Sequence, residues 1–291
     1  MKITSIKINA ILEKYNHKSQ KVYKWDRGQL NVIGGSSGYW GSSIMCAKAG
    51  YRVGVGYSCI ISQKKEVNFI SMIHPELLTK SILSKKNIQK LIPKDKNYKL
   101  AFVIGPGFGR TSALTDIIKF FLNTEHISIP VLLDADALYN LSCLNFKNNK
   151  ITLPSHWILT PHEGELARLI NKTKEYVHAH REKSLMLAFQ KYNCHILLKG
   201  NENLIIEPIQ KKIYRISVGN LTLAKAGSGD ILAGMIGGLL AQGFASLDAM
   251  IIATFWHADF ANWYIKEIGT NRTLLSSEII KYFPFYLRSK K

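Results

Sequence analysis

The chain has 291 residues, 46% hydrophobic and 20% charged, a composition typical of a globular protein and unlike that of a disordered one. Its net charge of +19 comes from scattered lysine pairs and a short basic tail rather than from a long basic block. This pattern favours a polyanionic small substrate over nucleic acid as the partner. The four cysteines form no CxxC pair and the N-terminus has no signal-like apolar run, so we expect a cytoplasmic protein without disulfides or a zinc site.

Short apolar runs alternate with glycine-rich turns in the first half of the chain, after a lead-in of helix and loop over residues 1–28. We predict strands at 30–33, 52–57, 67–72 and 101–104, and helices at 41–49 and 86–92. Two of the strands run into glycine-rich turns, GGSSG at 34–38 and GPGFG at 105–109. Glycines directly after a buried strand allow a ligand to approach the backbone closely, although either turn alone also fits a simple chain reversal.

The second half continues the same alternation. We predict strands at 130–133, 157–159, 195–198, 204–207 and 212–217. Helices are predicted at 114–121, 175–192, 231–241 and 246–265. Three further helices are predicted by one end only: one begins near residue 137, one ends at residue 170, and one begins near residue 276. The helix at 246–265 carries Asp248, His257 and Asp259, which favours a packed helix over a membrane span.

This order of elements predicts the fold class. Strands alternate with helices almost throughout, and most strands are continuous apolar runs. The sequence therefore predicts an α/β fold in which a mostly parallel central sheet carries helices on both faces. Because no internal repeat or linker interrupts the chain, we expect one domain over residues 1–291.

The stretch AGSGD at 226–230, followed by an apolar helix, is the strongest candidate site. A glycine-rich turn at a helix start presents free N–H groups and the positive end of the helix dipole to an anion, usually a phosphate. Asp230 repels phosphate and needs another role there. It can cap the helix, hold a metal, or take a proton from a hydroxyl that attacks phosphorus.

Two acidic turns and one basic turn also follow predicted strands. Asp134 and Asp136 lie at the carboxyl end of a strand, where one would cap the next helix and the other would face the site. His162 lies beside Glu163 and Glu165, which favours contact with a substrate or a metal-bound water over a buried structural role. The Lys199 turn fits either a plain strand exit or a phosphate contact. The shared position of all these turns at carboxyl ends of strands favours one ligand site.

Together these residues resemble a known family. The chain resembles the ribokinase-like superfamily, and within it the ADP- or ATP-dependent NAD(P)H-hydrate dehydratases, from about residue 26 to residue 284. The motifs that carry the resemblance are VIGGSSGYWGSS at 32–43, IGPGFGR at 104–110, LLDADAL at 132–138, LTPHEGELARL at 159–169, LLKG at 197–200 and GN…AGSGDILAGMIGGLLAQG at 219–243. Several of these motifs together are specific, whereas GSGD alone would indicate only the superfamily.

The resemblance implies a repair reaction. The family removes water from hydrated NADH and NADPH at the expense of a nucleotide phosphoanhydride, through phosphorylation of the hydrate's hydroxyl and loss of phosphate. In this chain, it implies that Asp230 accepts the hydroxyl proton and that the N–H groups of Gly227, Ser228 and Gly229 stabilise the developing charge.

The resemblance also implies binding residues and partners. The nucleotide, ADP or ATP, would be held by Lys199, Gly200, Asn201, Glu202, Asn203 and Gly229. The hydrate would contact Ser42, Gly107, His162 and Asp230. Glu165 would support Mg²⁺ through water. We expect a homo-oligomer, with no membrane or nucleic-acid partner. We also expect a separate NAD(P)H-hydrate epimerase, because the lead-in is too short for the epimerase domain that some relatives carry.

The chain departs from the family pattern at several positions. Asn203 stands where Thr is common, Ser42 and Ser43 stand where Ala is usual, and the segment 220–222 lacks a common Pro. The bulky pair Tyr39 and Trp40 would reshape the pocket. Three alternatives remain open: a hydroxymethylpyrimidine or sugar kinase of the same superfamily, a nucleotide-binding relative without turnover, and a nucleic-acid binder suggested by the charge.

Overall fold

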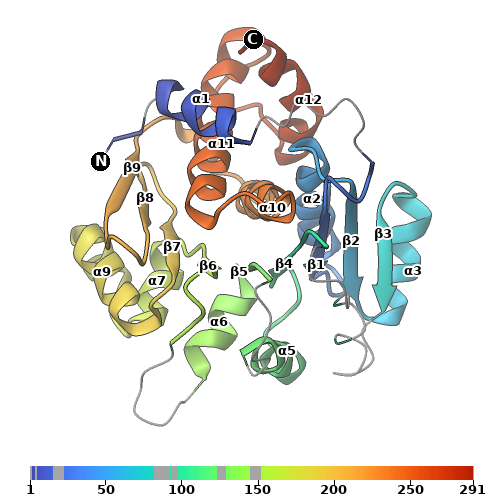
Figure 1. Ribbon diagram of the computed structural model, residues 1–291, viewed down its shortest axis with the longest axis horizontal. Helices are drawn as coiled ribbons and strands as arrows, with labels where there is room; N and C mark the ends of the chain where they lie inside the picture. Colours follow the sequence, from blue (N-terminus) through green and yellow to red (C-terminus); the bar gives the residue numbers. More distant parts are fainter. Residues whose placement is uncertain are drawn as a thin grey trace.

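A nine-stranded sheet runs through the part of the chain that the computed structural model describes, residues 2–3, 5–15, 23–81, 89, 92, 98–122, 129–144 and 152–290 (Figure 1). The strand order is β3-β2-β1-β4-β5-β6-β7-β8-β9. Its strands are β1 (Gln29–Ile33), β2 (Tyr57–Ser62), β3 (Leu78–Ser81), β4 (Leu100–Ile104), β5 (Val131–Leu133), β6 (Ile158–Leu159), β7 (His195–Leu198), β8 (Asn203–Ile206) and β9 (Ile213–Ile216). The strands from β3 to β7 pair in parallel, and only β8 and β9 pair antiparallel, which confirms the predicted mostly parallel sheet.

Helices cover both faces of this sheet, as Figure 1 shows. They are α1 (Ser5–Lys14), α2 (Trp40–Arg52), α3 (Lys64–Ile73), α5 (Ser112–Leu122), α6 (Asp136–Cys143), α7 (Glu163–Leu169), α8 (Lys174–Ala179), α9 (Arg181–Tyr192), α10 (Ser228–Ala241), α11 (Ser246–Glu267) and α12 (Ser276–Arg288). One apolar core joins α2, α10, α11 and α12 to the sheet, and a second joins α5, α6, α7 and α9 to the opposite face. Among the described helices, none is long and apolar enough to cross a membrane.

Three predicted elements differ from the observed ones. The strand predicted at 67–72 is wrong, because this segment lies in α3, where Val67 and Ile70 are buried at helical spacing while Met72 is exposed. The strand predicted at 52–57 is also misplaced, since α2 extends to Arg52 and β2 begins only at Tyr57. The helix predicted at 175–192 is interrupted at His180 and forms α8 and α9. The helix predicted at 86–92 lies outside the described residues except for positions 89 and 92.

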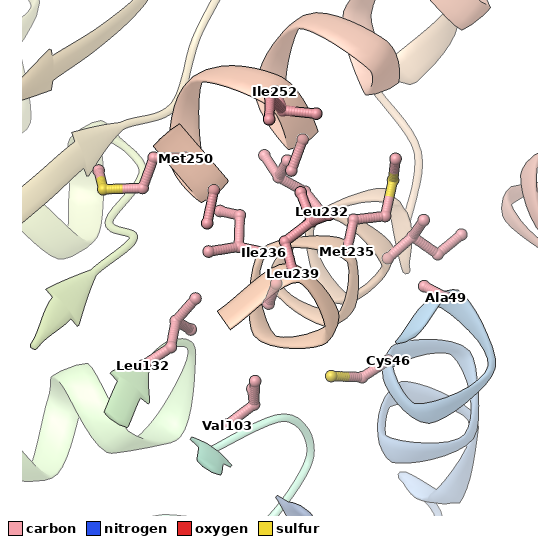
Figure 2. Close-up of a cluster of buried hydrophobic side chains, with 14 of the residues drawn as sticks. Cys46, Ala49, Val103, Leu132, Leu232, Met235, Ile236, Leu239, Met250 and Ile252 are labelled. Carbon is pink, nitrogen blue, oxygen red and sulfur yellow. The ribbon is translucent and has the colours of Figure 1, made fainter. Parts of the chain in front are cut away.

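The central helix α10 packs closely on α2 because glycines line their contact. A Cβ atom on Gly234 would lie 2.0 Å from the carbonyl oxygen of Cys46, and one on Gly238 would lie 2.9 Å from the Cα atom of Gly50. Figure 2 shows α10 between α2, α11 and the strands β4 and β5, with Leu232, Met235, Ile236 and Leu239 directed into the core. This contact fixes the first turns of α10 and α2 relative to each other.

Candidate active site

The first two glycine-rich turns are joined by hydrogen bonds at the carboxyl ends of β1 and β4. The N–H of Gly35 donates to the carbonyl of Pro106 at 2.9 Å, and the N–H and hydroxyl of Ser36 donate to the carbonyl of Gly107 at 2.6 and 2.9 Å. Gly107 has a φ of +61°, and a Cβ atom there would lie 2.5 Å from the carbonyl oxygen of Tyr39. Glycine at 107 therefore permits the two turns to meet.

The third turn brings Asp230 to these two. Gly227 is the N-cap of α10 with a φ of +86°, and a Cβ atom there would lie 2.3 Å from Cε of Met45. Asp230 lies in the first turn of α10 and accepts a hydrogen bond from the side chain of Ser42. Cβ of Ser42 would lie 3.1 Å from a Cβ atom on Gly107. The structure thus brings together Asp230, Ser42 and Gly107, three residues that the sequence predicts as parts of one site.

The environment of Asp230 makes its carboxyl group a weaker acid than usual. Burial, followed by the negative charge of Asp134, raises its pKa to about 6, although Ser42 and Lys199 act in the opposite direction. A carboxylate with a pKa near 6 is ionised at neutral pH and holds a proton more readily than an ordinary aspartate. This is the property that a general base needs.

Four ionisable side chains form what we term the charged cluster: Asp134, Glu165, Lys199 and Asp230. The Nζ atom of Lys199 lies 2.8 Å from Oδ1 of Asp134 and 3.9 Å from Oε2 of Glu165. Burial disfavours the charge on Lys199, but the carboxylates of Asp134 and Glu165 outweigh burial and raise its pKa. Burial also raises the pKa of Glu165 to about 7. A single buried lysine therefore compensates several carboxylates.

The two aspartates after β5 act differently from what the sequence predicts. Asp134 faces the site as expected, through Lys199. Neither aspartate caps α6, because its N-cap is Ala135, which has a φ of +48° and no side-chain cap. Asp136 instead accepts a hydrogen bond from the N–H of Gly109 at 2.8 Å and lies 3.5 Å from Arg110. The unusual backbone of Ala135 allows both carboxylates to serve the site instead of the helix.

His162 begins α7 and forms a capping box with Glu165. Its Nδ1 atom accepts hydrogen bonds from the N–H groups of Gly164 at 3.0 Å and Glu165 at 3.3 Å. The Glu165 carboxylate accepts from the N–H of His162 at 2.8 Å. Burial and the nearby Lys199 lower the pKa of His162, so its ring is neutral at pH 7. The ring also lines the cavity described next, so capping and ligand contact are compatible.

A cavity of about 800 Å³ opens beside the charged cluster. Of the residues that the sequence predicts for nucleotide binding, it is lined by Lys199, Gly200, Asn201, Asn203 and Gly229. The Asn203 side chain accepts a hydrogen bond from the N–H of Gly200 at 3.3 Å and closes this loop on itself. The sixth predicted residue, Glu202, does not line this cavity, since its carboxylate pairs with Arg215 at 3.1 Å and with the Ser217 hydroxyl at 2.6 Å.

We term one set of uncharged residues in the cavity lining the neutral wall: Val218, Asn220, Leu223, Ser228 and His257. Lys225 also lines the cavity beside them. Nε2 of His257 lies 3.1 Å from the hydroxyl of Ser228. Burial lowers the pKa of His257 to about 4, so the ring is uncharged at pH 7. Sequence reasoning did not identify this residue, although a histidine within an apolar helix was a usable signal.

A second residue missed from the sequence is Arg181, which holds the loop at 199–203. Its guanidinium pairs with Glu163 and donates to the carbonyl of Glu202 at 2.7 Å. A Cβ atom on Gly200 would lie 2.7 Å from the Arg181 guanidinium, so glycine at 200 leaves space for this contact. Nothing in the local sequence near Arg181 indicated that role.

The turn before α10 offers donors to an anion. Within the described part of the chain, the N–H groups of Gly227, Gly229 and Asp230 have no hydrogen-bond partner, as expected at a helix start. The N–H of Ser228 donates to the carbonyl of Lys225 at 3.2 Å, so it is already engaged within the turn. Two of the three N–H groups predicted for catalysis are therefore free.

No group of three or more His, Cys, Asp or Glu side chains in the described ranges is arranged to hold a metal ion. Glu165 has one oxygen 3.5 Å from Nε2 of His162 and the other in the capping box. A single carboxylate such as that of Glu165 is compatible with Mg²⁺, which usually binds one or two protein carboxylates together with substrate phosphates and water.

Known proteins resemble this chain in both sequence and structure. A family model described as NAD(P)H-hydrate dehydratase matches residues 30–284. The chain is similar to the ADP-dependent (S)-NAD(P)H-hydrate dehydratase of Neisseria meningitidis, with 33% identity over 268 residues that cover 91% of this chain and 86% of that protein. Other curated relatives are named as bifunctional NAD(P)H-hydrate repair enzymes, and the chain spans about half of their length.

Solved structures give the same result. The chain resembles the ADP/ATP-dependent NAD(P)H-hydrate dehydratase of Bacillus subtilis, which was co-crystallised with ATP and Mg²⁺, with a TM-score of 0.79, 27% identity and 94% of each chain covered. It also resembles a ribokinase-like superfamily protein of Enterococcus faecalis, with a TM-score of 0.82, 23% identity and coverage of 99% and 95% of the two chains. The predicted ribokinase-like fold is confirmed.

Proposed function

This chain belongs to the NAD(P)H-hydrate dehydratase family, and from that premise we propose that it uses ADP or ATP to dehydrate the (S)-form hydrates of NADH and NADPH. The products would be the reduced coenzymes. The observation that carries the proposal is the position of Asp230 in the first turn of α10, which borders an open cavity. There Asp230 accepts a hydrogen bond from Ser42 and lies next to the free N–H groups of Gly227 and Gly229.

The reaction has two steps in this proposal. The Asp230 carboxylate takes the proton of the hydrate's hydroxyl group. At the same time, the hydroxyl oxygen of the hydrate attacks the terminal phosphorus of the nucleotide, and the bond between that phosphorus and the bridging oxygen breaks. Loss of the phosphate group, with a proton from the adjacent carbon, then restores the double bond. Phosphate is a far better leaving group than hydroxide, which explains why a nucleotide is consumed.

The remaining residues position the two substrates. We propose that Lys199, Gly200, Asn201, Glu202, Asn203 and Gly229 bind the nucleotide, Glu202 through its main chain. The N–H groups of Gly227 and Gly229 would stabilise charge on the transferring group, and Ser228 would hold the turn through His257. Ser42, Gly107, His162 and Asp230 would contact the hydrate.

A magnesium ion fits this arrangement. When bound, it neutralises charge on the nucleotide phosphates, and Glu165 would contact it through water. The carboxylate of Glu165 is close to the phosphate-binding Lys199, which supports this assignment.

The cellular setting is also a proposal. All four cysteines are free, and Cys46, Cys59 and Cys194 are buried, which fits a reducing compartment such as the cytoplasm. We propose one domain, assembled as a homo-oligomer and supplied by a separate NAD(P)H-hydrate epimerase. The apolar residues of α11 are largely buried within the chain, so the exposed Leu275 and Phe285 are better candidates for a contact between subunits. Light scattering of the purified protein measures the assembly.

One assay tests the proposed activity. The protein is incubated with Mg²⁺, acid-hydrated NADH and either ADP or ATP, while absorbance in the reduced-nicotinamide band and free phosphate are followed together. A dehydratase restores the absorbance and releases one phosphate for each coenzyme repaired. A small-molecule kinase would instead accumulate a stable phosphorylated product, and a non-catalytic relative would bind the nucleotide without turnover; either outcome would reject the proposal.

A further inference from the structure

Two arginines and one tyrosine form a cluster near the candidate active site. The proposed reaction does not use this cluster. The guanidinium of Arg110 lies 4.4 Å from the centroid of the Tyr139 ring, and that of Arg168 lies 5.1 Å from the same centroid. The Arg110 side chain is 57% exposed, and Arg168 is also exposed. Packing on a ring reduces the freedom of both guanidinium groups while their donors remain open to solvent.

This cluster, Arg110, Tyr139 and Arg168, draws its arginines from two elements that also carry proposed contacts to the hydrate. Arg110 follows the turn that contains Gly107, and Arg168 is in the last turn of α7, the helix that His162 begins. The charge of Arg168 lowers the pKa of both His162 and Glu165, so its guanidinium lies close to the site. The cluster therefore connects the two elements proposed to contact the hydrate.

The charges in the cluster are incompletely balanced. Arg110 lies 3.5 Å from Asp136, whose other oxygen is occupied by the N–H of Gly109. Within the ranges that the structure describes, Arg168 forms no ion pair, and its guanidinium packs on the ring of Tyr139. Two guanidinium groups pack on one aromatic ring, and one carboxylate, that of Asp136, lies beside them. One positive charge is therefore left for a ligand.

We propose that Arg110 and Arg168 bind a phosphate group of the dinucleotide substrate, an inference that rests on the proposed function. Guanidinium groups match phosphate oxygens in a two-pronged geometry that lysine cannot reproduce. With the nicotinamide end at Asp230, the rest of the coenzyme leaves over this cluster, and its phosphates are the anionic groups it carries there. The phosphate is either the pyrophosphate, which NADH and NADPH share, or the 2′-phosphate of NADPH alone.

The test compares Arg168→Gln and Arg110→Gln with Arg27→Gln, which removes an equal charge before the amino end of β1, whereas the turns of the site follow the carboxyl ends of the strands. Kinetics with the hydrates of NADH and NADPH are measured for each variant, and binding of NADH and NADPH is followed by coenzyme fluorescence. We expect KM and the coenzyme Kd to rise about 10- to 100-fold in the two site variants, with kcat and the KM for ADP or ATP unchanged. Arg168→Lys should recover part of the loss.

The two coenzymes identify the phosphate. An equal loss for both assigns the pyrophosphate, and a loss confined to NADPH and its hydrate assigns the 2′-phosphate. If both coenzymes bind the site variants as tightly as they bind Arg27→Gln, the inference is wrong even where the wild type is fully active. An inactive wild type would reject the proposed function, whereas the fluorescence comparison would still decide whether the arginines bind phosphate.

Discussion

The two sides of the cavity differ in how they carry charge. The charged cluster combines three carboxylates with one buried lysine. Burial raises the pKa of Asp230 and Glu165, and, against the effect of burial, the carboxylates of Asp134 and Glu165 raise that of Lys199. The neutral wall has an uncharged histidine, a hydroxyl group and apolar side chains. Both sides meet at the turn that begins α10.

The difference separates the residues around the base from most of the residues proposed to bind the nucleotide, with Lys199 as the member of the charged cluster that also lines the cavity. A base needs neighbours that hold its pKa near the working pH, and the charged cluster provides them. Phosphate needs donors without competing carboxylates, and the neutral wall with the free N–H groups of Gly227 and Gly229 provides those. Substitutions on the two sides should therefore differ in their effects on turnover, nucleotide affinity and stability, and four predictions separate these effects in order of expected size.

The largest effect is expected for Asp230→Asn, which removes the base and retains the shape. Turnover should fall about 10²- to 10⁴-fold, while the Kd for ADP or ATP changes little, because the neutral wall is intact. Initial rates and calorimetric nucleotide binding measure the two quantities. Asp26→Asn, in the exposed turn before β1, is the control, and turnover of Asp230→Asn within a few-fold of wild type would contradict the assignment.

The next effect is on stability. Lys199→Met leaves the buried Asp134 without its cation, and the free energy of unfolding at pH 7 should fall by about 3 kcal/mol. Urea unfolding measures it. The double variant Asp134→Asn with Lys199→Met should recover more than half of this loss, because no buried charge is then unpaired. If the double variant is as unstable as the single one, the pair is not the cause.

A smaller effect is expected on the neutral wall. His257→Ala removes the partner of the Ser228 hydroxyl and should raise the KM for the nucleotide about 10-fold, with kcat reduced less. His257→Gln, whose amide can replace the ring nitrogen, should recover part of the affinity. His74→Gln at the end of α3 serves as the control. A fall in kcat at unchanged nucleotide KM would place His257 with the charged cluster instead.

The smallest effect links Asp230 to stability through pH. Its pKa is raised from 3.8 to about 6 on folding, so the folded protein binds this proton more tightly than the unfolded chain does. The contribution of this group to the free energy of unfolding therefore declines as the pH rises from about 4 to about 6. Above pH 7, Asp230→Asn should be more stable than wild type by about 1–2 kcal/mol, and at pH 4 the two should agree. Equal stability at every pH would show that the pKa is not raised.

Much of the fold was predictable, because continuous apolar runs such as 101–104 and 195–198 identify buried parallel strands. The structure of segment 67–72 was not predictable, since an apolar run of this length fits a strand or a helix. Its packing against β2 and β3 selects the helix α3. The candidate site divides in the same way. Turn chemistry locates the turn of Gly107 and the turn of Asp230, and the family resemblance adds Ser42. The pairing of Lys199 with Asp134 joins residues 65 positions apart and depends on the sheet order. Capping by His162 was hidden because histidine is not a usual cap.

The glycine contacts between α10 and α2 bring the backbones of the helices that carry Asp230 and Ser42 into direct contact. In hydrogen exchange, the amides of α10 should therefore be among the last to exchange, and they should open only with global unfolding. Substrate arrival and product departure then cannot involve separation of these two helices. We expect any opening for the ligands in the loop at 199–203 instead, because hydrogen bonds and ion pairs that water can replace hold this loop.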